Sequence, residues 1–496
     1  MTPKSAALVD DLVSILKSVQ TKRSAKGFLK KLFPQPNEDA TPSSTHQAPP
    51  VRLAVTKLAG VETIADDTLF GIGKTIQRMS RLGMQSIIVP SMSTPTGLSA
   101  CFASGKCASL AQVNELREQL RTQELSQLDR VSDILCQAGV LARPSYGTLY
   151  ASNADGVSLE AQRLLLETLQ NGYTSVIGNS VVNPGLCLTQ ITPDQVVLGV
   201  VRSFAQMKSN VSVERLIVID EVGGMPCPRR SHGSSHVLIN LAQEYVSLWP
   251  TLSPKHAENL QLVNSCLDLL PHSAAAIVTT PDAAVFNGST RQSHPIIHNI
   301  LTDRTVFSCS LPVDRSPETK TTLLRRGTPI YMYHGTDCLT NGSVSWDRIW
   351  YLLNDSFQRV FDMPRYLERI RHNLALVIVA GDYEGVAIIT LEQPQTPGAA
   401  PVPYLDKLAV LQKVQGTSAI ADFVFNAMCS VFSQEIVWRS RLDNPVNKWY
   451  FERSRGSLLS RSTPWRLFWT GYKSADQKRI QEYLDVIDSI QPTWIK

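Results

Sequence analysis

Short apolar runs alternate with longer amphipathic stretches between residues 51 and 330. The runs are rich in Val, Ile and Leu, and they predict buried strands at 52–56, 85–90, 215–220, 274–280 and 306–310. The amphipathic stretches have helical spacing, and they predict helices at 67–82, 110–138, 159–171, 193–208 and 254–269. Strands that alternate with helices predict an α/β domain with a mainly parallel sheet over residues 51–330.

The pattern changes after residue 330, where residues 331–342 predict a connector that contains Gly and Asp. Beyond it the periodicity predicts helices at 346–361, 365–372, 417–432 and 475–490. Strands are expected at 374–380, 385–391, 405–410, 436–441 and 465–472, and a proline-rich loop at 394–403. These elements predict a second domain of the α+β class over residues 346–496.

The first 50 residues form a separate segment, with a basic helical pattern at 7–33 and a Pro/Ser/Thr-rich linker at 34–50. A basic amphipathic start is typical of an organelle transit peptide, but such peptides are poor in acidic residues. Asp10 and Asp11 count against that interpretation. A helix that docks on the folded protein fits the pattern equally well.

Composition narrows the function classes without choosing one. The net charge of +5 over 496 residues comes without a strongly basic segment, so we expect no nucleic-acid binding. No run reaches the roughly 18 apolar residues that span a bilayer, so we expect no membrane insertion. The nine cysteines include no C-x-x-C pair and indicate reduced, packed thiols. His294 and His298 lack accompanying ligands, so we expect no metal site.

Two segments imitate an ATP-binding site. Gly71–Thr75 resembles the end of a P-loop, and Leu216–Glu221 resembles a Walker B strand. However, Thr68 stands where the first P-loop glycine belongs. The surrounding apolar residues also have helical spacing, which places Lys74 inside a helix rather than in a phosphate-binding loop. A P-loop NTPase is therefore disfavoured.

The segment Trp438–Phe451 combines arginines, asparagines and aromatic residues directly after an apolar run. If that run is a strand, Arg439 and Arg441 point to the same face, because side chains alternate along a strand. Two guanidiniums on one face suit a small ligand with two carboxylates, and Lys407 could assist them. The alternative is an exposed basic strand edge that only deters aggregation.

A second candidate site lies upstream, where the strand Tyr404–Val410 leads into a turn of small residues and a helix. Free backbone amides at such a helix start favour an anion. The turn resembles the acetyl-CoA pyrophosphate loop of GNAT N-acetyltransferases, whose pattern is Arg/Gln-x-x-Gly-x-Gly/Ala. Lys413 and Ser418 depart from that pattern. The resemblance assigns acetyl-CoA binding to Leu408, Ala409, Val410, Lys413, Val414, Gln415, Gly416, Thr417 and Ser418.

Together these motifs resemble the acetyltransferase domain of N-acetylglutamate synthases of the fungal and vertebrate type. The match rests on Tyr-Leu-Asp-Lys at 404–407, Trp-Arg-Ser-Arg-x-x-Asn-Pro-x-Asn-x-Trp-Tyr-Phe at 438–451, and the aromatic run 465–472. The first domain resembles an amino-acid-kinase fold, on Gly223-Gly224 and on 294–303. Its first strand lacks the paired glycines of that fold at Lys57–Gly60, so a regulatory role is favoured over phosphoryl transfer.

The resemblance implies transfer of acetyl from acetyl-CoA to L-glutamate, the first step of arginine biosynthesis, without a permanently bound cofactor. It also implies inhibition by arginine, a homotetramer, acetylglutamate kinase as a further partner and a location in the mitochondrial matrix. Tyr450 is the candidate acid for the departing thiolate, and Asn444 is expected to position the substrates. A non-catalytic subunit that senses arginine or binds the kinase remains the alternative, because the 413–418 loop is altered.

Overall fold

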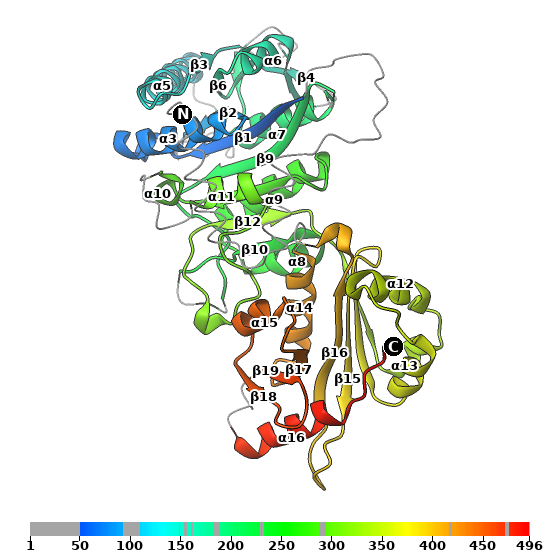
Figure 1. The fold of residues 1–496 in the computed structure, drawn as a ribbon. Coiled ribbons are helices and arrows are strands. Elements are labelled where there is room, and N and C mark those ends of the chain that lie inside the picture. Colours follow the sequence, from blue (N-terminus) through cyan, green and yellow to red (C-terminus); the bar gives the residue numbers. More distant parts are fainter. Residues whose placement is uncertain are drawn as a thin grey trace, which may run out of the picture. The chain divides into compact units, whose positions relative to one another are not determined.

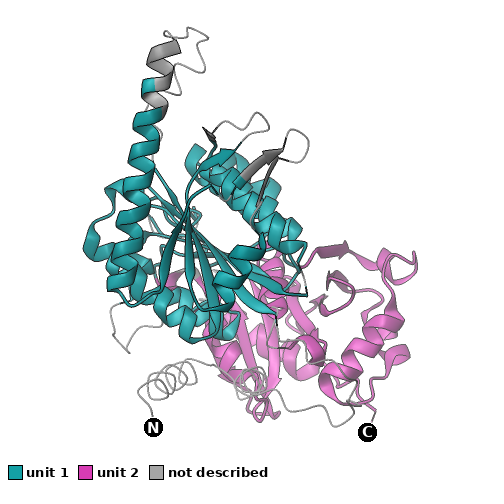
Figure 2. Ribbon diagram, turned by 90° about the horizontal axis from the view of Figure 1, so that it is seen from above, with its two compact units in different colours: residues 1–15, 37–306, 318–327 teal, residues 16–36, 307–317, 328–496 magenta. Residues whose placement is uncertain are grey.

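The computed structural model describes residues 50–92, 110–147, 149–152, 156–159, 162–182, 188–207, 209–228, 230, 233–286, 294–415, 419–471 and 476–495. The chain forms two compact units, which Figure 2 distinguishes by colour. The described part of unit 1 lies within Asn37–Val306 and Glu318–Gly327. That of unit 2 lies within Phe307–Pro317 and Thr328–Lys496.

Unit 1 is built on an eight-stranded sheet in the order β10-β12-β11-β9-β1-β2-β6-β3. Every neighbouring pair is parallel except β11 and β12, which are antiparallel. The mainly parallel sheet predicted for the first domain is therefore confirmed. The strands are β1 (Val51–Ala59), β2 (Met84–Ser91), β3 (Ala142–Ser145), β6 (Thr174–Ile177), β9 (Val211–Ile219), β10 (Leu238–Asn240), β11 (Ala275–Thr279) and β12 (Thr322–Arg325).

Helices cover both faces of this sheet, as Figure 2 shows. Leu53 and Val55 of β1 belong to the core that includes apolar residues of α7 and α9. Thr56 and Leu58 face the opposite way, toward α3 and α5. Burial on both faces explains why these strands are almost continuously apolar. The helices are α3 (Asp66–Arg81), α5 (Leu110–Gln137), α6 (Gln162–Gln170), α7 (Pro193–Ala205), α8 (Leu241–Leu248), α9 (Pro254–Leu269), α10 (Pro281–Ala284) and α11 (Pro295–Thr302).

Unit 1 also has a four-stranded sheet in the order β5-β4-β7-β8, which the sequence pattern did not predict. Its strands are β4 (Leu149–Ser152), β5 (Gly156–Leu159), β7 (Ser180–Val182) and β8 (Leu188–Gln190). They are only three or four residues long. Such short strands offer too few positions for an alternating pattern to stand out.

Unit 2 is built on a seven-stranded sheet in the order β13-β14-β15-β16-β17-β19-β18. All neighbouring pairs are antiparallel except β16 and β17, which are parallel. The strands are β13 (Ile330–His334), β14 (Leu374–Ala380), β15 (Gly385–Glu392), β16 (Val402–Val410), β17 (Ile436–Arg441), β18 (Gly456–Leu459) and β19 (Trp465–Thr470). This sheet with its helices matches the α+β class predicted for the second domain.

Helices also cover both faces of the second sheet (Figure 1). Val386 and Ile388 of β15 pack with the helices before β14, whereas a Cβ at Gly385 would meet Ile420 of α14. Polar N-caps start two of these helices: Ser345 accepts from Arg348 N, and Asp362 accepts from Arg365 N. The helices are α12 (Trp346–Phe357), α13 (Met363–Ile370), α14 (Ile420–Val431), α15 (Asn447–Arg453) and α16 (Gln477–Ser489).

Two predicted elements are wrong. The strand expected at 306–310 is absent, and residues 307–317 belong to unit 2 rather than to the sheet of unit 1. The connector expected at 331–342 instead holds β13, which pairs with β14 from Ile330 to His334. Both errors arise because local apolar content decides neither which sheet a segment joins nor whether it joins one.

Candidate active site

The central feature of unit 2 is a separation between two neighbouring strands. β16 pairs with β15 from Val402 to Val410, and β17 pairs with β19 along its whole length. Between β16 and β17, both lying wholly in the described part of the chain, the ladder consists of Tyr404 and Val437 alone. Beyond that pair the edge of β16 is open toward β17, so an extended ligand can add to it as a strand does.

The backbone of Leu408 and Val410 faces this opening. Leu411 N donates to Glu384 O at 2.9 Å, which places Leu411 among the residues that bond toward β15. Residues of an antiparallel ladder alternate in direction, so Ala409 also faces β15 while Leu408 and Val410 face β17. Gln415 Nε2 donates to the Val410 carbonyl at 2.8 Å. The amides of Leu408 and Val410 are therefore placed to donate to a bound chain.

A β-bulge in β16 turns two adjacent side chains toward a shared ion cluster. The register shifts between Ile388 and Ile389, which leaves Asp406 as the extra residue. Asp406 Oδ2 lies 2.9 Å from Lys407 Nζ and 2.8 Å from Arg369 Nη2. Arg369 Nη1 in turn lies 2.9 Å from Glu392 Oε1. Lys407, predicted to bind substrate, is thus already paired with a neighbouring carboxylate.

Burial and charge act in opposite directions on this cluster. Burial alone would raise the pKa of Asp406, but Lys407 and Arg369 more than compensate and lower it to about 2. Burial lowers the pKa of Lys407, although Asp406 opposes the shift. The sequence pattern pointed to Lys407 but not to Arg369, because nothing local links α13 to β16. Asp406 stood inside the quoted Tyr-Leu-Asp-Lys motif, so an acid beside the lysine was a usable signal.

The two arginines of β17 share a face of the sheet. Arg439 pairs with Leu467 and Arg441 with Trp465 in the β17–β19 ladder. Arg439 Nη1 donates to the carbonyl of Ile487, and its guanidinium lies 4.3 Å from the centre of the Trp465 ring. Arg441 is half exposed and uses Nε for Asp443 Oδ1 at 3.1 Å. Both guanidiniums keep further N–H groups for which the described residues supply no hydrogen bond.

Asn444 and Tyr450 lie on the opposite face from the two arginines. Asn444 Nδ2 donates to Ser440 Oγ at 2.8 Å, and Ser440 alternates with Arg439 and Arg441 along β17. Tyr450 comes from α15, a helix that the sequence pattern did not predict. Its ring centre lies 5.6 Å from that of Trp438 and 5.5 Å from that of Phe468. The predicted residues are thus split between the two faces that border the opening.

Burial keeps the phenol of Tyr450 in its protonated form. Burial raises its pKa to about 12, so the phenol stays protonated at any physiological pH. Trp438 is 1% exposed and packs against Phe425, Phe468 and Tyr450. Trp438 and Trp449 therefore act in the aromatic packing of this face.

The proposed acetyl-CoA loop is anchored to α12. Lys413 and Val414 lie in the 3-10 turn η5 (Gln412–Val414), and Lys413 is exposed. Gln412 N donates to Asp355 Oδ2 at 2.7 Å, which holds the start of the loop. Gly416, Thr417 and Ser418 lie outside the described residues.

Unit 1 holds a buried polar cluster where the amino-acid-kinase resemblance places a phosphate loop. β1 continues through Ala59, so Lys57 lies within a strand. Lys57 Nζ pairs with the carboxylate of Asp194 and lies 3.3 Å from Asn259 Oδ1. Asn259 Nδ2 donates to Asp220 Oδ2 at 3.1 Å. These groups are therefore bonded to one another within unit 1.

The apparent P-loop lies inside a helix, as predicted. Gly71–Thr75 belongs to α3, and Lys74 Nζ donates to the Ala138 carbonyl at 3.0 Å. His298 is buried and His294 is half-buried, and removal from solvent lowers the pKa of each to about 4. Within the described ranges no three His, Cys, Asp or Glu side chains gather to hold a metal ion. Nor does any described helix have the length and apolar character to cross a membrane.

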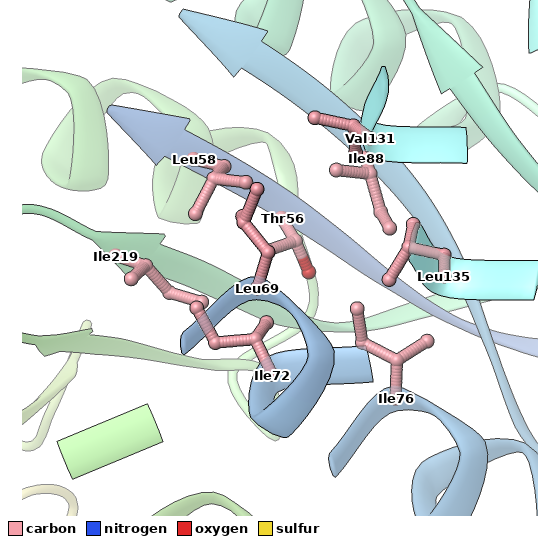
Figure 3. A pocket seen from close by; sticks show the side chains of 9 residues that line it. All are labelled: Thr56, Leu58, Leu69, Ile72, Ile76, Ile88, Val131, Leu135 and Ile219. Carbon is pink, nitrogen blue, oxygen red and sulfur yellow. The ribbon is translucent and has the colours of Figure 1, made fainter. Parts of the chain in front are cut away.

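A small cavity in unit 1 is unsuited to polar chemistry. Figure 3 shows it between β1 and the helices α3 and α5. Thr56 is the only lining residue with a polar side chain, and its hydroxyl is buried without a hydrogen-bond partner among the described residues. The lining residues are Thr56, Leu58, Leu69, Ile72, Ile76, Ile88, Val131, Leu135 and Ile219. No charged group is present to hold an amino acid there.

The sheet of unit 2, open between β16 and β17, is that of an N-acetyltransferase domain, and comparison with known proteins agrees with it. Residues 334–490 match the family model described as the N-acetyltransferase of N-acetylglutamate synthase. The chain is 46% identical to the mitochondrial amino-acid acetyltransferase of Schizosaccharomyces pombe, covering 99% of both chains. It is 32% identical to the Yarrowia lipolytica protein of the same name, covering 99% of this chain and 94% of that one.

The chain belongs to the mitochondrial amino-acid acetyltransferases. The predicted acyltransferase activity and mitochondrial location are thereby confirmed, and the non-catalytic alternative loses its support. Among solved structures, N-acetylglutamate synthase from Neisseria gonorrhoeae, complexed with coenzyme A and N-acetyl-glutamate, aligns with a TM-score of 0.49 at 14% identity. That alignment covers 85% of this chain and 95% of the other.

Proposed function

We propose that this chain transfers the acetyl group of acetyl-CoA to the amino group of L-glutamate, the first step of arginine biosynthesis. The observation that carries the proposal is the opening between β16 and β17, with paired arginines on one face and Tyr450 on the other. An acyl donor bound in the opening and a dicarboxylate bound beside the opening would meet at the edge of the opening.

Acetyl-CoA would add to the open edge of β16. The amides of Leu408 and Val410 would bind its pantetheine arm, and one of them could polarise the thioester carbonyl. Ala409 supports this edge from the β15 side. The pyrophosphate would lie at the loop of Lys413, Val414 and Gln415, with Gly416, Thr417 and Ser418 completing it. A flexible lysine in place of the usual Arg or Gln supplies charge without a planar fork.

Glutamate would bind through its two carboxylates to Arg439 and Arg441. Each guanidinium keeps N–H groups for which the described residues supply no hydrogen bond, so each can hold one carboxylate. Lys407 is a weaker contributor than the sequence suggested, because Asp406 already neutralises it. It would add positive potential near the substrate rather than a dedicated contact.

The chemical step would be direct attack within a ternary complex. The glutamate amine, as a free base, forms the new C–N bond while the C–S bond of the thioester breaks. The amine proton leaves to water, Tyr450 donates its phenol proton to the departing thiolate, and the resulting phenolate regains a proton from water. Asn444, fixed by Ser440, would orient the reacting groups. Proximity of the two bound substrates would supply much of the rate.

The family resemblance also implies how the protein is regulated and assembled, and we include both in the proposal. Arginine would act as feedback inhibitor through unit 1, the chain would form a homotetramer, and acetylglutamate kinase would be a partner. The pairing of Lys57 with Asp194 and Asn259 supports a regulatory rather than a phosphoryl-transferring unit 1. Light scattering on the purified protein, with and without arginine, measures the assembly directly.

Substrate selectivity tests the two-arginine assignment. Glutamine matches glutamate in size but lacks the second carboxylate, so its kcat/KM should fall by about tenfold or more. Product formation by mass spectrometry with glutamate, glutamine and aspartate gives the comparison. Equal rates with glutamine would refute the assignment. No product with any amino acid, from folded protein, would return the regulatory-subunit alternative.

A further inference from the structure

Residues 307–317 interrupt unit 1 in the sequence and belong to unit 2. The chain belongs to unit 1 up to Val306 and again from Glu318, whereas Phe307–Pro317 belongs to unit 2. We call this segment the strap. It contains Ser308, Ser310 and Arg315, and each of these side chains bonds to residues of unit 2. The contacts converge on the two helices that flank the proposed acetyl-CoA site.

The first contact point is Arg453, the last residue of α15. It is 1% exposed. Its Nε donates to Ser310 Oγ at 2.5 Å, and Nη2 donates to Ser308 Oγ at 2.6 Å. Nη1 donates to the Trp449 carbonyl at 3.0 Å and to Glu452 Oε2 at 3.4 Å. With Nη2 also bonded to Asp422, all five N–H groups of the guanidinium are used.

The second contact point is Asp422, in the first turn of α14. Its Oδ1 accepts from Ser308 Oγ at 3.0 Å, from Ser310 Oγ at 2.5 Å and from Arg453 Nη2 at 2.9 Å. One turn further on, Asn426 Nδ2 donates to the Cys309 carbonyl at 3.4 Å. The strap is therefore bonded to α14 and α15 at the same time.

The third contact point is the end of α15. Arg315 is exposed, and its Nη1 donates to the Ser454 carbonyl at 3.0 Å. Ser454 is the C-cap of α15. A cation that bonds the last carbonyls of a helix also complements the negative end of its dipole. The strap thus holds the end of α15 through two contacts, one to the side chain of Arg453 and one to the carbonyl of Ser454.

We infer that the strap, together with Arg453 and Asp422, forms a clamp that positions Tyr450 against the bound thioester. Tyr450 lies one turn before Arg453 on α15, and α14 begins directly after the loop assigned to pyrophosphate. The clamp therefore sets the donor-binding helix and the acid-bearing helix in one geometry. This inference rests on the proposed role of Tyr450 as the proton donor.

The chemistry of the clamp favours positioning over simple stability. A buried ion pair is weak evidence for stability, because well-packed apolar residues of the same volume often do as well. A guanidinium with five directed bonds instead selects one arrangement of its partners. The strap makes this arrangement more restrictive, because its serine hydroxyls bond both Arg453 and Asp422. Neither α14 nor α15 can therefore shift alone.

The Ser308→Ala/Ser310→Ala double variant tests the clamp while leaving the Arg453–Asp422 pair in place. We expect kcat to fall about tenfold, with the KM of glutamate changed less than twofold, because a small misplacement affects chemistry more than binding. The matched control is Ser460→Ala/Ser462→Ala, which removes two hydroxyls that donate to Asp488 in the same unit. The control should lower Tm comparably and leave kcat unchanged.

A double-mutant cycle with Tyr450→Phe distinguishes positioning from general damage. If the clamp acts through Tyr450, the serine variant should lower kcat about tenfold in the wild type but less than twofold in Tyr450→Phe. Equal losses in both backgrounds, or no loss in the wild type, would overturn the clamp. Full activity of Tyr450→Phe alone would instead overturn the role of Tyr450 on which the clamp depends. Arg315→Ala is a second, surface variant if the double variant does not fold.

Discussion

Arg441→Ala is the sharpest test of how the second sheet recognises its substrate. Arg441 is half exposed, and Asp443 occupies only its Nε. The Nη1–Nη2 end of the guanidinium therefore remains for a carboxylate. Charge-assisted hydrogen bonds of this kind contribute about 1.5–3 kcal/mol. Solvent exposure selects the lower end, about 1.5 kcal/mol, which corresponds to roughly a tenfold change in affinity.

We expect Arg441→Ala to raise the KM of glutamate about tenfold and to change kcat less than twofold, because the contact is made equally in the ground and transition states. Arg441→Lys should give an intermediate KM, since it keeps the charge and loses the planar fork. Initial rates of acetylglutamate formation over a range of glutamate concentrations, at saturating acetyl-CoA, provide both constants.

Arg371→Ala is a matched control for this experiment. Arg371 lies in the same unit, its side chain is 53% exposed against 50% for Arg441, and it pairs with Glu368 much as Arg441 pairs with Asp443. The control should leave both constants unchanged. An unchanged KM in Arg441→Ala, or an equal rise in Arg371→Ala, would refute the carboxylate contact.

Three further predictions concern other parts of the molecule. Tyr450→Phe should lower kcat about 10²-fold, and because the pKa of Tyr450 is about 12, wild-type kcat should show no loss from its ionisation between pH 7 and 10. Asp406→Asn should destabilise unit 2 by about 3 kcal/mol at pH 7, because it leaves the buried Lys407 without its carboxylate partner and leaves Arg369 paired with Glu392 alone. The folded-state pKa of Asp406, about 2, lies below its ordinary value, so the difference in urea midpoint between wild type and Asp406→Asn should shrink as pH falls toward 2. Thr56→Val should stabilise unit 1 by about 1 kcal/mol, because it removes a buried hydroxyl that has no partner among the described residues, and calorimetry should show a higher Tm.

Periodicity predicted the longer helices and strands, which bury either one face or all of their faces. The helix α9 begins and ends where the pattern placed it, at Pro254 and Leu269, and β14 spans 374–380 as expected. The same signal located β17 and so the shared face of Arg439 and Arg441. These features depend on neighbours along the chain, which the sequence displays directly.

The parts that could not be predicted depend on partners far away in sequence. The apolar start of the strap suggested a strand, but its serines bond Arg453, which lies more than a hundred residues further along the chain. Arg369 reaches Asp406 across two elements. The short helix α15 follows an Asn-Pro pair that signals only a break. Long-range ion pairs leave no periodic trace, so only the folded chain reveals them.

The proposed function requires the two faces beside the β16–β17 opening to bring acetyl-CoA and glutamate together. Its most direct test follows a labelled acetyl group from acetyl-CoA into product, using the purified full chain and mass spectrometry. We expect labelled N-acetylglutamate in one-to-one ratio with released CoA, and little product from glutamine. Folded protein that releases no CoA above background, or that acetylates glutamine as fast as glutamate, would contradict it.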